Sequence, residues 1–257
     1  MADKERYLIN SVLRAFKLLE AFSYDRPRYS HTELAGLLDI NKSSLTRLLN
    51  TLVTAGYLDK DRKTGEYVLA SKIVGIAGVY LGHMEIHKAA RPILAEIAKY
   101  LGETVHLGIL DDYHVLYIDK IDTQRSVGMK SYVGRRLPAY SSALGKNLLA
   151  WLDEEKLERY LRSVALKSFT PNTITDAAEL REHLKMVKRQ GYAVDNQENE
   201  PHLFCVGAPV FDMNRRAIAA ISIAAPSFRI DTPEVKAKSI KTVIEAANNI
   251  SRRLGYV

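Results

Sequence analysis

Apolar residues recur with helical spacing near the start of the chain. Ile9, Val12, Leu13 and Phe16 lie three or four positions apart. This spacing predicts a helix over residues 6–23 with one continuous apolar stripe.

Capping signals mark the next two helices. Ser30 is followed by Glu33, a pair that matches the capping box, so residues 32–39 are predicted to be helical. Asn41 is suited to cap a third helix, which Gly56 would end. The apolar positions of this third helix are spaced to form one buried face: Leu45, Leu48, Leu49, Leu52 and Val53.

The polar side of the third helix lacks the Glu and Lys pairs of an ordinary solvated helix. At about 100° per residue, Ser43, Arg47 and Asn50 point away from the buried face. Ser and Thr are mediocre helix formers, so solubility alone would favour Glu and Lys there. Short hydroxyl side chains let a helix come close to DNA bases, and Arg can hold a guanine with two hydrogen bonds. We therefore expect this helix to bind in the major groove of DNA. The contacts would come from Lys42, Ser43, Ser44, Thr46, Arg47 and Asn50.

Residues 56–70 predict a β-hairpin that turns at Gly65. Its tip is basic, and Arg62 and Lys63 are expected to reach backbone phosphates or the minor groove. Three helices followed by a basic hairpin is the order of a winged helix-turn-helix. We therefore predict that residues 1–70 form a DNA-binding domain.

After residue 70 the pattern of predicted elements changes. A helix is predicted over residues 71–88, with a break near Pro92 because the residue before a proline is biased away from helix. This gives a linker helix, residues 71–90. Through residues 91–257, hairpin-connected strands are interspersed with helices, which favours an α+β domain with a mixed or antiparallel sheet covered by helices. One expected strand is VGMKSYVG, residues 127–134.

Composition and charge narrow the class of protein. The chain has 257 residues, of which 47% are hydrophobic and 26% charged, as in soluble globular proteins. The net charge is +7, but residues 1–70 hold 11 Lys and Arg against 9 Asp and Glu, a net of only +2. The DNA-binding prediction therefore rests on the placement of side chains and not on bulk charge. The single cysteine excludes an intrachain disulfide, and no run approaches the ~20 apolar residues of a membrane span. A cytoplasmic protein without a membrane partner is expected.

The second domain offers a candidate site for a small anion. Asp195, Cys205 and Ser222 are polar residues within strand-like apolar runs. A helix that starts near Ser142 would present free backbone N–H groups, which suit a carboxylate. Asp195 is the strongest candidate, because an Asp among strand residues needs a partner.

Several motifs in order resemble those of IclR-type bacterial transcriptional regulators. They are TELAGLLDINKSSLTRLLNTLVTAGYLDKDRKTGEYVLASKIVGIAGVYL, GRRLPAYSSALGKNLLAWL, GYAVDNQENEPHLFCVGAPVFD and AIAAISIAAP, and they cover nearly the whole chain. The resemblance implies a cytoplasmic dimer, commonly paired into a tetramer, that binds a palindromic operator on double-stranded DNA. We expect it to act as a repressor, although the sequence does not distinguish a repressor from an activator. It also implies a C-terminal domain with a fold related to GAF and PAS domains that binds a small metabolite, often a carboxylate. We expect the linker helix, with Phe16 and Leu18 of the first helix, to form the dimer interface.

The resemblance also implies which residues bind the effector. The pocket would be lined by Met129 and Leu137, with the effector held by the amides of Ala143 and Leu144 and by the polar groups of Asp195, Cys205 and Ser222. The sequence departs from the family pattern at three positions. Ala224 replaces a frequent Ser, His202 a common Gly, and Gln197 a common Glu.

Other functions fit parts of the pattern less well. A Cys-dependent enzyme would need Cys205, His202 and Asp195 as a nucleophilic set. Two side chains three positions apart on a strand, as His202 and Cys205 are, tend to point to opposite faces. A nonspecific DNA binder would need more positive charge in residues 1–70. His83 and His87 have the spacing of a metal pair, but no third ligand is evident. No catalytic residue, metal or cofactor is expected.

Overall fold

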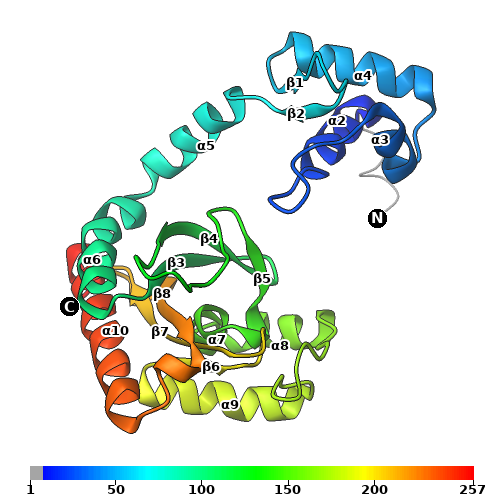
Figure 1. Cartoon of the computed structure of the whole chain (residues 1–257). Helices are drawn as coiled ribbons and strands as arrows, with labels where there is room; N and C mark the ends of the chain where they lie inside the picture. The colour runs from blue at the N-terminus through cyan, green and yellow to red at the C-terminus, as the bar shows by residue number, and fades with distance from the viewer. Residues whose placement is uncertain (1–7) are drawn as a thin grey trace. The chain divides into compact units, whose positions relative to one another are not determined.

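The computed structural model describes residues 8–257 (Figure 1). The chain divides into two compact units, one ending at Leu81 and the other formed by Gly82–Val257. Among the described residues, no helix is long and apolar enough to cross a bilayer.

The N-terminal unit follows the predicted order of three helices and a hairpin over its described residues. The capping box is present: the Ser30 hydroxyl accepts a hydrogen bond from the Glu33 amide, and the Glu33 carboxylate accepts one from the Ser30 amide. The Asn41 side chain accepts from the Ser44 amide and begins the third helix. The elements are α2 (Asn10–Glu20), α3 (His31–Leu38), α4 (Lys42–Thr54), β1 (Leu58–Lys60) and β2 (Tyr67–Leu69).

One prediction for the first helix was wrong. Leu18 is fully buried in the core of this unit, whereas Phe16 is 57% exposed. Two residues along a helix are about 200° apart, so these side chains cannot share one interface. Residues 6 and 7 of the predicted helix lie outside the described residues. The core of the unit consists of Leu18, Phe22, Tyr29, Leu34, Leu45, Leu49, Leu52, Leu58 and Tyr67.

The predicted helix break near Pro92 is also wrong. The chain breaks at Met84, whose backbone is extended, between α5 (Lys72–His83) and α6 (Glu85–Leu101). Pro92 lies inside α6. Residues before and after the proline, including Ala90 and Ile93, are buried, so packing of the helix outweighs the local bias against it.

The C-terminal unit is built on an antiparallel sheet, which is one of the two alternatives predicted, a mixed or an antiparallel sheet. Six strands pair in the order β5-β4-β3-β8-β7-β6. The strands are β3 (Thr104–Asp111), β4 (His114–Ile121), β5 (Arg136–Pro138), β6 (Ala193–Asn196), β7 (Leu203–Phe211) and β8 (Ala217–Pro226).

The strand expected over residues 127–134 is absent from the described sheet, and the short strand β5 follows it instead. The end of this segment is bonded to β4, because the Gly134 amide donates to the Tyr117 carbonyl and the Tyr117 amide donates to the Arg135 carbonyl. The Arg135 amide donates to the Tyr132 carbonyl, as in a turn. The side chains of the segment nevertheless alternate in burial: Met129 is buried and Lys130 is exposed. The described backbone hydrogen bonds thus attach the segment to β4 near its end and do not pair it along its length.

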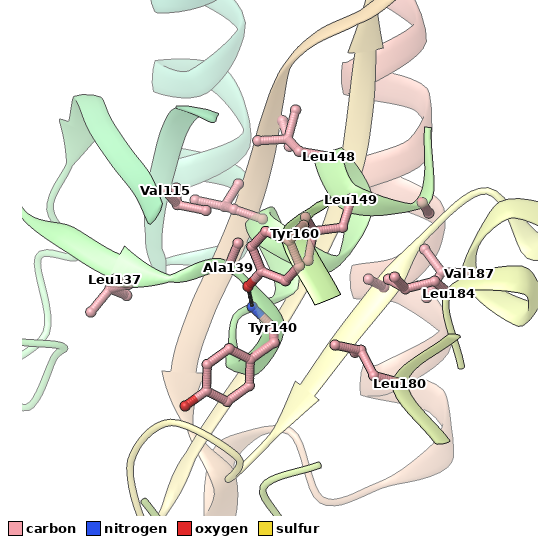
Figure 2. Packing of buried hydrophobic residues seen from close by; sticks show 14 of the residues in the cluster. Val115, Leu137, Ala139, Tyr140, Leu148, Leu149, Tyr160, Leu180, Leu184 and Val187 are labelled. Atoms are coloured by element: carbon pink, nitrogen blue, oxygen red, sulfur yellow. Dashed lines mark hydrogen bonds between the residues drawn. The ribbon is translucent and has the colours of Figure 1, made fainter. Parts of the chain in front are cut away.

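Helices cover both faces of the sheet (Figure 1). α6 packs beside α10 on one face, and α7 lies against the other with α9 behind it. A hydrophobic cluster fills the α7 side, where the Tyr140 amide donates a hydrogen bond to the Tyr160 hydroxyl (Figure 2). The remaining helices are α7 (Ala143–Ala150), α8 (Glu154–Ser163), α9 (Ala177–Gln190), α10 (Pro233–Arg253) and the short 3-10 turns η1 (Ala139–Ser141) and η2 (Ser227–Arg229).

Candidate nucleic-acid interface and ligand site

Helix α4 turns its polar face to solvent. Leu45 and Leu49 are fully buried, while Arg47 and Asn50 are exposed. In the described part of the chain, the side chains of Lys42, Arg47 and Asn50 have neither a hydrogen-bond nor an ion-pair partner. Their donors are therefore available to another molecule.

The hydroxyl groups on the same face are partly used within the protein. Thr46 Oγ1 donates to the Lys42 carbonyl over 2.8 Å and lies 2.9 Å from His31 Nε2. The Ser43 hydroxyl donates to Asn41 Oδ1. The donors of both hydroxyls are therefore used within the protein. Ser44 is half-buried on the flank.

The tip of the β1–β2 hairpin is held by Asp61. One carboxylate oxygen accepts from the amides of Lys63 and Thr64, and the other accepts from the Arg28 guanidinium. These bonds to backbone amides lower the pKa of Asp61. The carboxylate is thereby occupied, and the exposed side chains of Arg62 and Lys63 remain unpaired among the described residues.

In the C-terminal unit, the residues implied as effector contacts lie around one small cavity. The space they enclose, about 10 Å³, is close to that of a single water molecule. The lining comprises all seven residues expected there, Met129, Leu137, Ala143, Leu144, Asp195, Cys205 and Ser222, together with Tyr117, Ser142, Asn199 and Leu203.

The sheet register brings the polar groups together. Asp195 on β6 is paired with Cys205 on β7, and Cys205 is paired with Ala224 on β8. Ser222 lies two residues before Ala224 on the same strand, so both side chains are on one face. Ala224 packs in a small hydrophobic cluster with Met129 and Cys205.

Helix α7 presents its N-terminus to this cavity. Ser142 caps the helix by accepting from the Gly145 amide, while the amides of Ala143 and Leu144 have no hydrogen-bond partner among the described residues. Position 145 must be glycine for this arrangement, because a Cβ there would lie 2.2 Å from the Ala139 carbonyl oxygen. The close approach fixes the two free amides at the edge of the cavity.

Asp195 is 3% exposed, and burial raises the pKa of its carboxyl to about 7. Amide donors oppose that rise: Asp195 Oδ1 accepts from Glu198 over 2.7 Å and from Asn199 over 3.4 Å. The negative charge of Glu198 and the positive charge of Lys146 add smaller, opposing effects on the same pKa. The group can therefore hold or release a proton near neutral pH.

Sequence reasoning missed a buried ion pair beneath the cavity. Lys146 has a fully buried ammonium group that donates to Glu198 Oε1 and to the Val194 carbonyl, each over 2.5 Å. Burial raises the pKa of Glu198, while Lys146 opposes that rise. The signal in the sequence was a lysine within the helix ALGKNLLA, whose other residues apart from Asn147 are small or apolar.

The Cys-dependent set does not assemble. Cys205 is buried, and that burial raises the pKa of its thiol well above the ordinary value, the opposite of an activated nucleophile. His202 is exposed and has a φ of +61°, the left-handed conformation that favours glycine. This left-handed backbone is the conformation expected for the glycine that the family resemblance implied at this position.

The two histidines considered as a metal pair lie on different helices, because the break at Met84 separates His83 from His87. The assumption of one helix was wrong. His87 Nε2 instead lies 3.4 Å from the buried Asp119 carboxylate, which also accepts a 2.5 Å bond from Arg91. These contacts attach α6 to strand β4.

Both parts of the chain match family models. Residues 11–62 match the IclR helix-turn-helix domain, and residues 78–252 match the C-terminal domain of bacterial transcriptional regulator IclR. The regulator XynR of Escherichia coli is 36% identical over 249 residues, covering 97% of this chain and 98% of XynR. The regulator KdgR of Escherichia coli is 35% identical over 254 residues, covering 99% of this chain and 96% of KdgR.

Solved structures agree with the sequence matches. The IclR of Thermotoga maritima has a TM-score of 0.79 at 35% identity, with 96% of this chain and 99% of that chain covered. An IclR homologue from Microbacterium hydrocarbonoxydans, complexed with 4-hydroxybenzoate, has a TM-score of 0.84 at 24% identity, with coverage of 95% and 98%. The second likeness concerns the fold alone.

Proposed function

Since this chain belongs to the IclR family of bacterial transcriptional regulators, we propose that it is a repressor whose operator binding is modulated by a small carboxylate. The observation that carries the proposal is the presence, in one chain, of an unpaired Lys/Arg/Asn face on α4 and a cavity where free helix amides adjoin Asp195. We assign residues 1–70 to DNA binding, 71–90 to the linker and 91–257 to effector binding and assembly.

DNA is contacted by α4 in the major groove and by the hairpin tip on the phosphates. Arg47 and Asn50 are free to reach base edges, and Arg62 and Lys63 are free to contact the backbone. Lys42 lies at the first turn of α4 and supplies a further phosphate contact. Ser43, Ser44 and Thr46 allow the helix to approach closely and offer acceptor oxygens.

The operator is palindromic because two copies of the chain bind it together. The stripe on α2 is exposed, with Ile9 at 66%, Val12 at 44% and Phe16 at 57%. Helix α5 also has no buried residue, although most of it is apolar. Burying these apolar surfaces between two copies would stabilise a dimer. Two-fold symmetry would place two α4 helices in major grooves about 34 Å apart, and pairing of dimers would give a tetramer.

The effector is a carboxylate bound at the N-terminus of α7. The amides of Ala143 and Leu144 would donate to its oxygens, and the helix dipole adds to the attraction. Met129, Leu137 and Cys205 would contact its carbon skeleton, with Asp195 and Ser222 supplying polar contacts. The related fold from Microbacterium hydrocarbonoxydans holds 4-hydroxybenzoate, which has such a carboxylate.

The cavity is too small for such a molecule as it stands, so part of its wall must move. The segment that carries Met129 is the candidate, because it is not hydrogen-bonded into the sheet as a strand. Effector binding would shift this segment. The affinity for DNA would change because the effector binds one conformation of the protein more tightly than the other.

Asp195→Ala tests the effector site. Thermal unfolding and operator binding would be followed with a panel of small carboxylates and sugar acids, including 4-hydroxybenzoate. We expect the variant to bind DNA as the native chain does but to lose the response to the active carboxylate. A matched variant outside the cavity, Asp231→Asn, should keep the response. If Asp195→Ala responds normally, the effector binds elsewhere.

A further inference from the structure

A groove runs between α2 and α4 in the N-terminal unit. It has a volume of about 520 Å³. Ser11 and Arg14 of α2 line it together with Arg47 and Thr51 of α4, and part of its surface is apolar, including Ala15 and Leu48. No carboxylate is among the lining residues.

The two arginines have no internal partner to neutralise them. Arg14 and Arg47 are both exposed, and neither forms an ion pair or side-chain hydrogen bond within residues 8–257. The positions three and four residues away from Arg14 on α2 are Asn10, Ser11, Lys17 and Leu18, so no acid is within helical reach. The positions around Arg47 are likewise non-acidic: Ser43, Ser44, Asn50 and Thr51.

Two other arginines in the same unit differ from this charge pattern. Arg26 is paired with Glu33, and Arg28 with Asp61. Those pairs stabilise the connection before α3 and the hairpin. Arg14 has no such structural role, and it faces the same groove as the DNA-reading residue Arg47.

We propose that this groove holds a phosphodiester segment of the DNA backbone and that Arg14 contacts a phosphate there. The inference rests on α4 binding in the major groove. A guanidinium can grip a phosphate with two parallel hydrogen bonds, and Ser11, three residues earlier on the same helix side, adds a hydroxyl donor. The apolar surface at Ala15 and Leu48 suits the deoxyribose between phosphates.

A second copy of the chain is the alternative occupant, and the two unpaired arginines disfavour it, because a symmetric contact between two copies would bring like charges together. At about 100° per residue, Phe16 lies about 200° round the helix from Arg14. Val12 of the exposed apolar stripe does line the groove, whereas Phe16 does not, so the stripe borders the groove along one side.

The test compares Arg14→Gln with Lys17→Gln, which removes the same charge from the same helix but outside the groove lining. Affinity for a random-sequence duplex would be measured over a range of salt concentrations. We expect Arg14→Gln to weaken binding roughly fivefold to tenfold and to reduce the log–log salt slope by about 0.9, the loss of one phosphate contact. Arg14→Lys should restore the slope but not the full affinity, because it lacks the guanidinium fork.

Each other outcome counts against the inference. Equal effects of Arg14→Gln and Lys17→Gln would mean that only overall charge matters. An unchanged slope with a weakened dimer in sedimentation would assign the groove to a second copy. If Arg47→Ala weakens DNA binding while Arg14→Gln does not, the groove proposal fails alone; if the native chain binds no DNA, the proposed function fails with it.

Discussion

Lys146 and Glu198 form an ion pair inside the C-terminal unit, with Nζ 2.5 Å from Oε1 and the lysine side chain fully buried. The pair links α7, whose free amides adjoin the cavity, to the turn whose Glu198 amide holds Asp195. Removing one partner of a buried pair leaves an uncompensated charge, and that loss is far larger than for a surface pair.

Lys146→Met should therefore lower the free energy of unfolding by about 3–5 kcal/mol. Urea unfolding can be followed by the fluorescence of the single tryptophan, Trp151, which packs edge-on against Phe211 in the same unit. The exposed pair Lys185–Glu182 supplies the control, since Lys185→Met should cost no more than about 1 kcal/mol. A Lys146→Met loss as small as that of the control would show that the buried pair does not stabilise the unit.

Asp195→Asn should change how stability depends on pH. The pKa of Asp195 is about 7 in the folded chain and 3.8 as the ordinary value. Between these values the folded state keeps a proton that the unfolded state releases, so raising the pH lowers the free energy of unfolding. The Asn variant lacks this loss and keeps an acceptor for the Glu198 amide. Its stability relative to the native chain should rise from pH 4 to 7 by a few kcal/mol, at about 1.4 kcal/mol per pKa unit. A pH-independent difference would contradict the raised pKa.

The same proton should affect the binding of the proposed effector. A carboxylate bound beside Asp195 favours the protonated form of that side chain. Affinity for the active carboxylate should therefore increase as the pH falls towards about 7 in the native chain and level off below that value. Calorimetric titrations in buffers of different ionisation enthalpy would detect the proton taken up. Absence of proton uptake would place the ligand carboxylate away from Asp195.

Arg47→Ala should lower the affinity for the operator by about 1–3 kcal/mol and relax the preference at one base position. The side chain is exposed on α4 and unpaired among the described residues, so its removal costs no internal contact. Operator variants at each base position would be compared in binding assays. If selectivity is unchanged, Arg47 does not read a base.

Phe16→Glu should weaken the dimer, because a charge would be placed within the exposed stripe of α2. Leu37→Glu is a matched control, since Leu37 is also exposed, at 58%, but belongs to α3. Sedimentation velocity over a range of protein concentrations would measure the assembly state of both variants. Equal behaviour of the two variants would move the interface away from α2.

The sequence predicted those structural elements that depend on interactions between residues close together in the chain. The capping box at Ser30 and the Asn41 cap depend on residues three positions apart, so they could be recognised without knowing the fold. The break at Met84 could not, because the packing of Ala90 and Ile93 on the sheet decides that the helix continues through Pro92. Long-range contacts outweighed the local bias there.

The candidate site shows the same division. The family resemblance indicated seven residues that do lie around one cavity, including Asp195 and Ser222. It did not indicate Lys146 or Glu198, which lie 52 residues apart and meet only in the folded chain. The face of α2 that would be buried in a dimer was also ambiguous, because an apolar stripe does not reveal whether its partner is the same chain or another copy.

Selection of bound sites from a random DNA pool tests the central claim most directly. Affinities for the enriched sites and for random DNA would then be measured at two salt concentrations. We predict an enriched palindrome bound ~10³-fold or more tightly than random DNA, with the preference retained as salt rises. Binding without an enriched motif, lost as salt rises, would mean that the exposed basic side chains only hold phosphates, and it would contradict a sequence-specific regulator.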